Sequence, residues 1–178
     1  MNRILFGVSL VCVISAAISD IQTRKIPNWL TLPSILLGLV LNGGFFGWSG
    51  LVLSLKGLGL GFLLLFFWHL LGGIGAGDVK LLSAVGAILG PRLVFFAFIW
   101  TAIVGGVIAV TVMIARKAVI QTFRNLKTLI QSWVITGANS DANLTIRNQS
   151  LIKLPYGVAI AIGTSLAVWL QWVPGLEF

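Results

Sequence analysis

Long apolar runs that carry almost no charge dominate this chain and constrain its fold more than any motif. Hydrophobic residues make up 58% of the 178 residues and charged residues only 9%. About 20 apolar residues in a helix span the hydrocarbon core of a bilayer, and such a helix satisfies its own backbone hydrogen bonds. We therefore expect an all-α polytopic membrane protein, with one membrane-embedded domain over residues 1–178 and about six transmembrane helices.

The expected spans follow from the runs and from the residues that interrupt them. Val79–Ala115 is apolar but contains Gly90-Pro91-Arg92, and a proline ends or kinks a helix. We expect two short spans that meet there in a tight turn, or one kinked span and a partial one. The other expected spans are Ile4–Ser19, Trp29–Gly47, Leu51–Leu71 and Pro155–Trp172. A cleaved signal peptide is a second interpretation of the first run, which Arg3 precedes.

The distribution of Lys and Arg predicts how the spans are oriented. Nine of these residues fall on the side of the loop after Asp20 and three on the other, and the basic side of a membrane protein is cytoplasmic. The nine are Arg24, Lys25, Lys80, Arg116, Lys117, Arg124, Lys127, Arg147 and Lys153; the three are Arg3, Lys56 and Arg92. Both termini are then non-cytoplasmic. Because topology explains the net charge of +8, we expect no nucleic-acid partner.

One long polar insertion, residues 116–150, separates the expected fifth and sixth helices. Apolar residues recur in its first half at spacings of four, three, four and three, which places them on one helix face. They are Val119, Phe123, Leu126, Ile130 and Trp133. This pattern predicts a cytoplasmic amphipathic helix that lies on anionic lipid. A simple connector explains it nearly as well.

Two aspartates occupy positions where a membrane protein rarely carries acids. Asp20 closes the first apolar run, and Asp78 closes the run Leu51–Gly77; the two remaining acidic residues are Asp141 and Glu177. An ionised carboxylate at bilayer depth costs about 2.5–3.5 kcal/mol even on a lenient scale. The topology brings both aspartates to the cytoplasmic interface. Two carboxyl groups that share one proton activate water for aspartic proteolysis.

Two other interpretations of the aspartates remain. Each could be a solvated cap at the end of a helix, or the pair could serve a small proton- or cation-coupled transporter. A transporter favours ionisable residues near the midplane and an inverted repeat, and we find no repeat. We expect no metal or other cofactor, because Cys12 is a single cysteine within an apolar run and His69 is the only histidine. We interpret His69 as a packed or interfacial residue.

The sequences around the two acids suggest local structure. Asp20-Ile-Gln-Thr-Arg24-Lys25-Ile26-Pro27-Asn28 combines an acid at a helix end with basic residues and a new helix start. Pro27 favours the entry into that helix, and Asn28 can cap it. In Gly73-Ile-Gly75-Ala-Gly77-Asp78-Val-Lys80-Leu81, the glycines before the acid allow another backbone to approach closely. Lys80 is interpreted equally well as tuning the pair or as binding lipid phosphate.

These segments resemble the type IV prepilin peptidase family of intramembrane aspartic endopeptidases. The resemblance comprises an Asp followed by Arg and Ile-Pro-Asn, a Gly-x-Gly-Asp-x-Lys-Leu segment, and Leu154-Pro155-Tyr156-Gly157-Val-Ala-Ile-Ala161. It implies that Asp20 and Asp78 are catalytic and that the matching motif residues support them. The supporting residues are Arg24, Pro27, Asn28, Gly75, Gly77, Lys80, Pro155, Tyr156 and Gly157.

The resemblance also implies a function, a location and partners. The substrate would be a type IV prepilin or pseudopilin whose short basic leader is removed at the cytoplasmic face of the bacterial inner membrane. The lipid bilayer and the pilus assembly machinery are the other expected partners. Larger members of the family carry a cytoplasmic domain with paired CxxC cysteines and also methylate the pilin. This chain begins directly with its first helix and has one cysteine, so it looks like the small peptidase-only branch that serves Flp/Tad-type pili.

Overall fold

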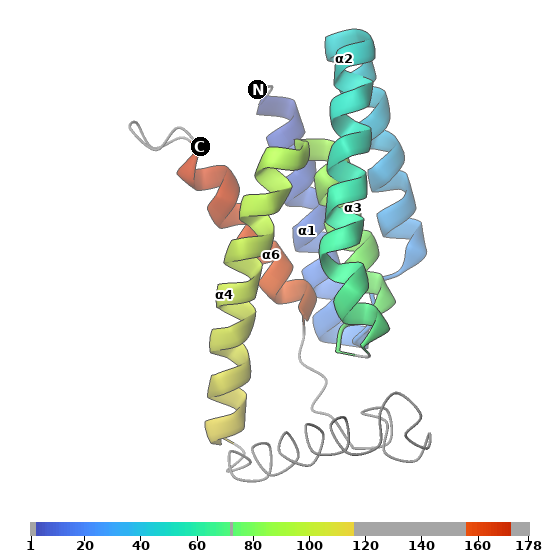
Figure 1. Cartoon of the computed structure of the whole chain (residues 1–178). Coiled ribbons are helices and arrows are strands. Elements are labelled where there is room, and N and C mark those ends of the chain that lie inside the picture. The colour runs from blue at the N-terminus through green and yellow to red at the C-terminus, as the bar shows by residue number, and fades with distance from the viewer. Residues whose placement is uncertain (1–2, 72, 116–155, 172–178) are drawn as a thin grey trace, which may run out of the picture. The chain divides into compact units, whose positions relative to one another are not determined.

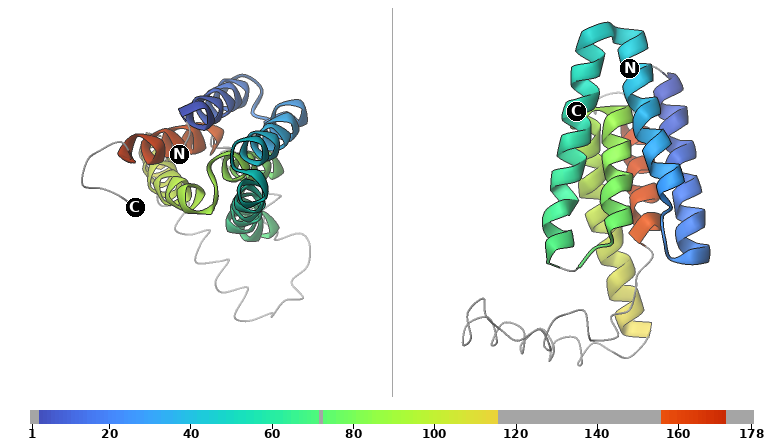
Figure 2. Two further views of the ribbon diagram at one scale, coloured as in Figure 1. Left: turned by 90° about the horizontal axis from the view of Figure 1, so that it is seen from above. Right: turned by 90° about the vertical axis from the view of Figure 1, so that its right-hand side faces the viewer.

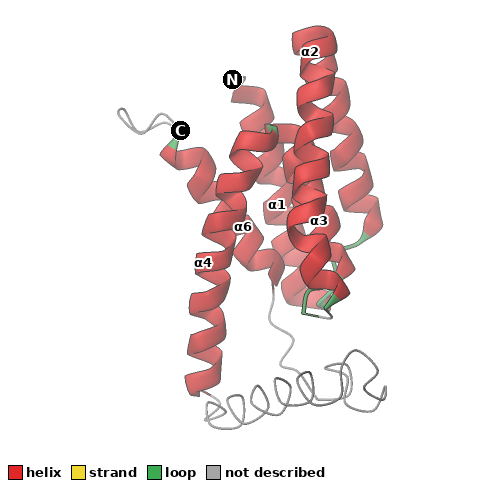
Figure 3. Cartoon of the chain, in the orientation of Figure 1, coloured by secondary structure: helices red, strands yellow, loops and turns green. Residues whose placement is uncertain are grey.

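The computed structural model describes residues 3–71, 73–115 and 156–171, and every regular element in these ranges is a helix (Figures 1 and 3). The helices are α1 (Arg3–Thr23), α2 (Asn28–Leu70), α3 (Ala76–Leu89), α4 (Pro91–Ala115) and α6 (Tyr156–Leu170). The expectation of an all-helical protein is confirmed for this part of the chain. The polar insertion 116–150, Pro155 and Trp172 lie outside the described residues.

The chain divides into two units, residues 1–105 with 155–178, and residues 106–154. The first unit contains α1, α2, α3, α6 and most of α4, and it holds both suspect aspartates. Of the second unit, the structure describes only the C-terminal part of α4. The prediction of a single domain over the whole chain stays a prediction.

Helix α2 is a hairpin of two antiparallel legs (Figure 2). The chain reverses at Gly47, whose φ of 62° and ψ of −143° interrupt the helix. Glycine adopts this region readily, whereas a side chain would make it costly. The legs correspond to the expected spans Trp29–Gly47 and Leu51–Leu71, and the turn between them is tighter than expected.

Three of the described helices are long and apolar enough to cross a membrane, namely α1, α2 and residues Pro91–Val112 of α4. The protein is therefore a multi-pass membrane protein. Helices α3 and α6 have 14 and 15 residues. At 1.5 Å per residue, α3 is about 21 Å long, which is shorter than a hydrocarbon core of about 30 Å.

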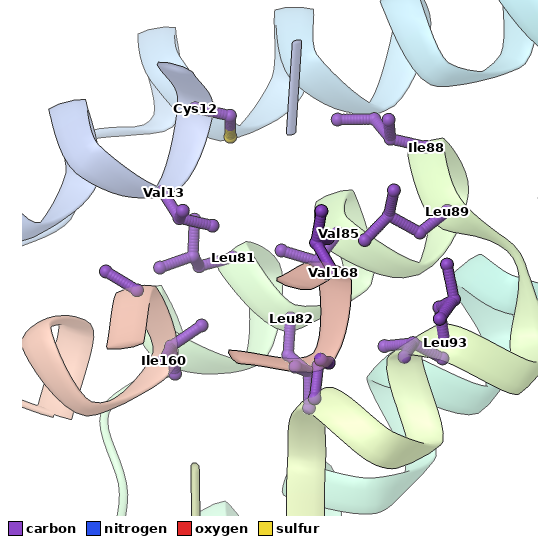
Figure 4. Close-up of a cluster of buried hydrophobic side chains, with 14 of the residues drawn as sticks. Cys12, Val13, Leu81, Leu82, Val85, Ile88, Leu89, Leu93, Ile160 and Val168 are labelled. Carbon is purple, nitrogen blue, oxygen red and sulfur yellow. The ribbon is translucent and has the colours of Figure 1, made fainter. Parts of the chain in front are cut away.

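Helix α3 is the central helix of the first unit. It packs against α1, α2 and α6, and almost every residue from Val79 to Leu89 is buried. A helix that is apolar all round belongs in such a position. Figure 4 shows its side chains meeting those of α1, α4 and α6 in one core that includes Val13, Ile160 and Val168.

Close backbone contact joins α2 to α3. A Cβ at Gly57 or Gly61 would collide with backbone atoms of Gly86 or Leu82 in α3. Small residues allow this approach where lipid gives no hydrophobic drive for helix association. The sequence pattern Gly57-Leu-Gly-Leu-Gly61 therefore serves helix packing.

The end of α3 is capped by side chains from both legs of α2. The Asn42 amide donates hydrogen bonds to the carbonyls of Ala87 and Ile88, each at 3.1 Å, and the Ser54 hydroxyl also donates to Ala87. The last carbonyls of a helix have no partner within the helix. Asn42 and Ser54 supply that partner inside the protein, and Gly90, with a φ of 83°, then turns the chain into α4. The expected break at Gly90-Pro91-Arg92 is confirmed.

Candidate active site

Asp20 and Asp78 line one cleft at the end of the helices where the α1–α2 and α2–α3 loops meet. The cleft has a volume of about 290 Å³. It is lined by Asp20, Arg24, Lys25, Ile26, Gly75, Ala76, Gly77 and Asp78. Residues from two of the three sequence segments therefore form its walls, although 58 positions separate the two acids. The prediction that the fold brings the aspartates together is supported by this geometry.

Asp20 is a buried carboxylate held by α6. Helix α1 extends to Thr23, one turn beyond the expected end at Ser19, so Asp20 lies within the helix and not after it. Its side chain is only 7% exposed, and its Oδ2 accepts a hydrogen bond of 2.8 Å from the main-chain N–H of Gly157. A charged group at this depth requires such a partner.

Gly157 leaves no room for a side chain beside Asp20. A Cβ at this position would lie 2.9 Å from Asp20 Oδ2 and 3.2 Å from Cγ. The third sequence segment therefore completes the site from a position 137 residues further along the chain. Tyr156, the first residue of α6, is half-buried and lies against Gly105 of α4.

Asp78 lies in the first turn of α3, outside the three long apolar helices. Its Oδ2 accepts a hydrogen bond of 3.2 Å from the N–H of Gly75, the residue before the helix. Burial and, to a smaller extent, the charge of Asp20 raise the pKa of the Asp78 carboxyl from 3.8 to about 7, and the hydrogen bond from the Gly75 N–H opposes both effects. Desolvation and a like charge both favour the neutral acid. At neutral pH, Asp78 therefore gains or loses a proton readily.

The loop after α1 has a specific conformation. Arg24 has a positive φ of 52°, and its N–H donates to the Asp20 carbonyl at 2.8 Å. The hydroxyls of Ser19 and Thr23 both donate to the carbonyl of Lys25, at 3.0 and 3.1 Å. These bonds turn the chain sharply after Asp20, so that Arg24 and Lys25 line the cleft.

Gly77 allows the two loops to meet. A Cβ at Gly77 would lie 3.1 Å from Ile26 Cβ and 3.4 Å from the Ile26 carbonyl oxygen. The expectation of a close approach by another segment is confirmed at Gly77, where the partner within the chain is Ile26. Ile26 is a wall of the cleft that sequence reasoning did not single out, although it precedes Pro27 in the first motif.

The expected role of Asn28 is wrong. Pro27 occupies the position before α2 and forms no side-chain cap, and Asn28 is the first residue of the helix. The Asn28 side-chain oxygen instead accepts a hydrogen bond of 2.9 Å from Lys80 Nζ. Asn28 and Lys80 thus join the starts of α2 and α3, which gives Lys80 a definite partner.

Sequence reasoning also did not find the contact that His69 makes. The ring is half-buried, and Nδ1 lies 2.8 Å from the carbonyl oxygen of Ile74. Since a carbonyl only accepts, Nδ1 is the donor. His69 therefore holds the loop that precedes Gly75. Among the described residues, no three His, Cys, Asp or Glu side chains come together as metal ligands would.

The arrangement has the parts needed for acid–base hydrolysis. One buried carboxylate and one carboxyl with a raised pKa border the same cleft. Such a pair can hold one proton between them, so that one oxygen accepts a proton from water while the other donates to a carbonyl. Pro155, the remaining predicted site residue, lies outside the described residues.

Comparison with known proteins identifies relatives of this chain. A family model described as the type IV leader peptidase family matches residues 7–110. The chain is 35% identical over 137 residues to a prepilin leader peptidase/N-methyltransferase of Neisseria gonorrhoeae, a match that covers 71% of this chain and 46% of that protein. It is 36% identical over 102 residues to the prepilin peptidase EppA of Methanothermobacter thermautotrophicus, covering 53% of this chain and 26% of that protein.

A third relative is a prepilin leader peptidase/N-methyltransferase of Burkholderia pseudomallei, 37% identical over 115 residues, 56% of this chain and 35% of that protein. The chain thus spans less than half the length of each of these relatives. No solved structure matches the chain.

Proposed function

The chain belongs to the type IV leader peptidase family, and on that premise we propose that it is an aspartic endopeptidase that removes the leader of type IV prepilins. The observation that carries the proposal is that Asp20 and Asp78 line one cleft, while the main-chain N–H of Gly157 holds Asp20. Family membership alone would not say which residues act. The two acids are the proposed catalytic residues.

The proposed reaction is the hydrolysis of one peptide bond by an activated water. Asp20 and Asp78 share a proton; one carboxylate takes a proton from the water, and the other carboxyl group hydrogen-bonds to the scissile carbonyl oxygen. Gly75 and Gly77 support this role, because they line the α3 side of the cleft and add no side chain to it. An extended substrate segment can then bring its backbone close to the acids.

We also propose the finer topology. The two legs of α2, together with α1, α3, α4 and α6, make six membrane-embedded segments, with both termini outside the cytoplasm. Arg24 and Lys25 line the cleft, and the excess of Lys and Arg that the sequence predicts for the side of the Asp20 loop supports a cytoplasmic active site. In this orientation the chain lies in the bacterial inner membrane, and the substrate's hydrophobic helix stays in the bilayer while its basic leader reaches the cleft.

The finer family assignment is to the peptidase-only branch that serves Flp/Tad-type pili. The cysteine content supports it: the 178 residues include one cysteine, Cys12, which is buried in α1, and they hold no CxxC pair. The prepilin substrate and the pilus assembly machinery are the proposed partners.

Coexpression with candidate prepilins from the same genome tests the function. We expect the leader to be removed by the wild-type protein, which a gel shift of the pilin detects. Asp20→Asn and Asp78→Asn each keep the size of the side chain but lose the acid, so each should lower cleavage at least about a hundredfold. Asp141→Asn makes the same chemical change away from the two motifs and is the control. Normal cleavage by either active-site variant would refute the aspartic mechanism.

A further inference from the structure

The two acids of the proposed catalytic pair, Asp20 and Asp78, accept hydrogen bonds from different parts of the fold. Asp78 is held from within its own segment, by the N–H of Gly75 three residues earlier at 3.2 Å. Asp20 is held by a different helix, through a shorter bond of 2.8 Å from Gly157. Asp20 is also the more buried of the two, since Asp78 is half-exposed to the cleft.

The Gly157 contact combines two effects that favour a negative charge. A hydrogen bond to an ionised acceptor is shorter and about twice as strong as one between neutral groups. Gly157 is the second residue of α6, and the free N–H groups at the start of a helix together attract negative charge. The hydrogen bond and the start of α6 therefore offset the cost of burying a negative charge on Asp20, which is almost completely removed from solvent.

The absence of a side chain at Gly157 is required for this contact. A Cβ there would lie 2.9 Å from the same oxygen that accepts the hydrogen bond. It would also lie 3.0 Å from Asp20 Cβ, so the acid could not simply move aside along α1. The glycine thus fixes Oδ2 of Asp20, whose side chain also lines the cleft.

We propose that the first turn of α6 is a positioning element for the reaction: the main-chain N–H of Gly157 holds Asp20 as the ionised member of the pair, so that Asp20 takes the proton of the attacking water and Asp78 starts protonated. This inference rests on the proposed peptidase function and assigns different roles to the two acids. Gly157 does not touch the substrate; it acts through Asp20.

Every proton and every bond is accounted for in the proposed reaction. Asp20 takes one proton from water as the water oxygen bonds to the scissile carbonyl carbon, and Asp78 gives its proton to the carbonyl oxygen. The tetrahedral diol then loses the C–N bond: the leaving nitrogen takes the proton from Asp20, and Asp78 regains its proton from one hydroxyl. The products are the leader's carboxylic acid and the new pilin amine, and both aspartates return to their starting states.

The charged neighbours of Asp20 agree with this assignment. Within the described residues, the other charged or titratable groups that line the cleft are Asp78 from α3 and Arg24 and Lys25 from the α1–α2 loop. Tyr156 precedes Gly157 in α6. The two basic residues favour an ionised acid nearby.

An NMR titration tests the ionisation states without depending on cleavage. The chain has only three aspartates, Asp20, Asp78 and Asp141, so ¹³Cγ-labelled aspartate in nanodiscs gives three signals that Asp→Asn variants assign. At pH 6 we expect the Asp20 signal at the carboxylate position and the Asp78 signal at the protonated position. The reverse pattern, or two protonated acids, would overturn the assignment.

Two variants at Gly157 test the positioning role. An ester at this residue, made by incorporating glycolate in place of Gly157, removes the N–H and adds no atom. Because the carboxylate then loses a hydrogen bond, the Asp20 signal at pH 6 should move from the carboxylate position toward the protonated position. Gly157→Ala adds the colliding Cβ and should also displace the acid. An ester variant with an unchanged Asp20 signal at pH 6 would refute the role of the N–H.

A packing control and a cleavage profile complete the test. Gly163→Ala crowds Thr101 in α4 from the same helix and touches neither acid; it should lower stability but leave the pH profile in place. In the ester variant, the acidic limb of the cleavage profile should move to higher pH, and movement of the alkaline limb would mean that the roles are reversed. The wild-type protein could show the expected NMR titration but cleave no prepilin. That result would refute the proposed function and the catalytic roles of the two acids, but it would still support the hydrogen bond from Gly157 to Asp20.

Discussion

Asp78 should make the protein less stable as the pH rises, and replacing it by Asn should remove that loss. The folded protein raises the pKa of this carboxyl from 3.8 to about 7. The folded state therefore binds a proton more tightly than the unfolded chain does. The stabilisation this gives is complete below about pH 4 and disappears as the pH rises through 7. Above pH 7 the folded protein carries an ionised acid that its half-buried site disfavours.

The size of the effect follows from the shift. About three pH units at 1.36 kcal/mol each correspond to about 4 kcal/mol between pH 4 and pH 8. Because Asp78 is only half-buried, solvent reduces this figure, and we expect a difference of about 2–4 kcal/mol. Asp78→Asn keeps the acceptor for the Gly75 N–H but has no proton to lose. The variant should therefore be more stable than the wild type at pH 8 and equally stable near pH 4.

Thermal unfolding in nanodiscs, followed by the fluorescence of the seven tryptophans, measures this difference between pH 4 and pH 9. Asp141→Asn is the matched control and should follow the wild-type curve. A stability gain in Asp78→Asn that is constant across the pH range would show that packing causes it. No gain at pH 8 would show that the site does not disfavour the ionised acid, and the reasoning from burial would then be wrong.

Three further predictions follow from other parts of the molecule. A cysteine at Thr23 or Asn139, in a Cys12→Ser background, should be labelled only by a reagent that reaches the cytoplasm, whereas a cysteine at Ser49 should be labelled from outside; the opposite pattern would invert the topology. Asn42→Leu should lower the free energy of unfolding by about 1–3 kcal/mol, because the Ile88 carbonyl loses its side-chain donor and the Ala87 carbonyl keeps only Ser54. Gly59→Ala, in the same helix with open space around it, should not lower it, and unfolding by denaturant in nanodiscs measures both variants. Mass spectrometry of the mature pilin should find a free N-terminal amine, and an added methyl group that depends on this protein would refute the peptidase-only assignment.

The two acids of the site could be predicted from the sequence, because an ionised carboxylate has a high free-energy cost anywhere within a membrane. Asp20 and Asp78 stand out against apolar runs, and the basic residues orient both toward one side. Apolar length and turn residues likewise located the hairpin near Gly47 and the break at Gly90. These features depend on a residue's own neighbours, and such local signals are what a single sequence carries.

The parts that sequence reasoning missed depend on distant partners. Asn28 has the chemistry of a helix cap, but Lys80 lies 52 residues further on and binds its side chain in the fold. Gly157 stood in a recognisable motif, yet nothing nearby indicates that its N–H faces Asp20. Asn42 is an isolated polar residue in an apolar stretch of the sequence. Its role cannot be inferred from its neighbours, because the helix end that it caps lies 45 residues away.

The bond between Asp20 and Gly157 has a consequence for how the protein is made. Asp20 enters the membrane with α1, but its partner follows 137 residues later. At about 5–20 residues per second, a ribosome needs roughly 7–30 seconds to deliver that partner. During synthesis α1 must therefore carry an acid without its hydrogen-bond donor. Insertion of α6 then supplies the Gly157 N–H to Asp20, so that a nascent chain acquires this hydrogen bond only when this last described helix is in place.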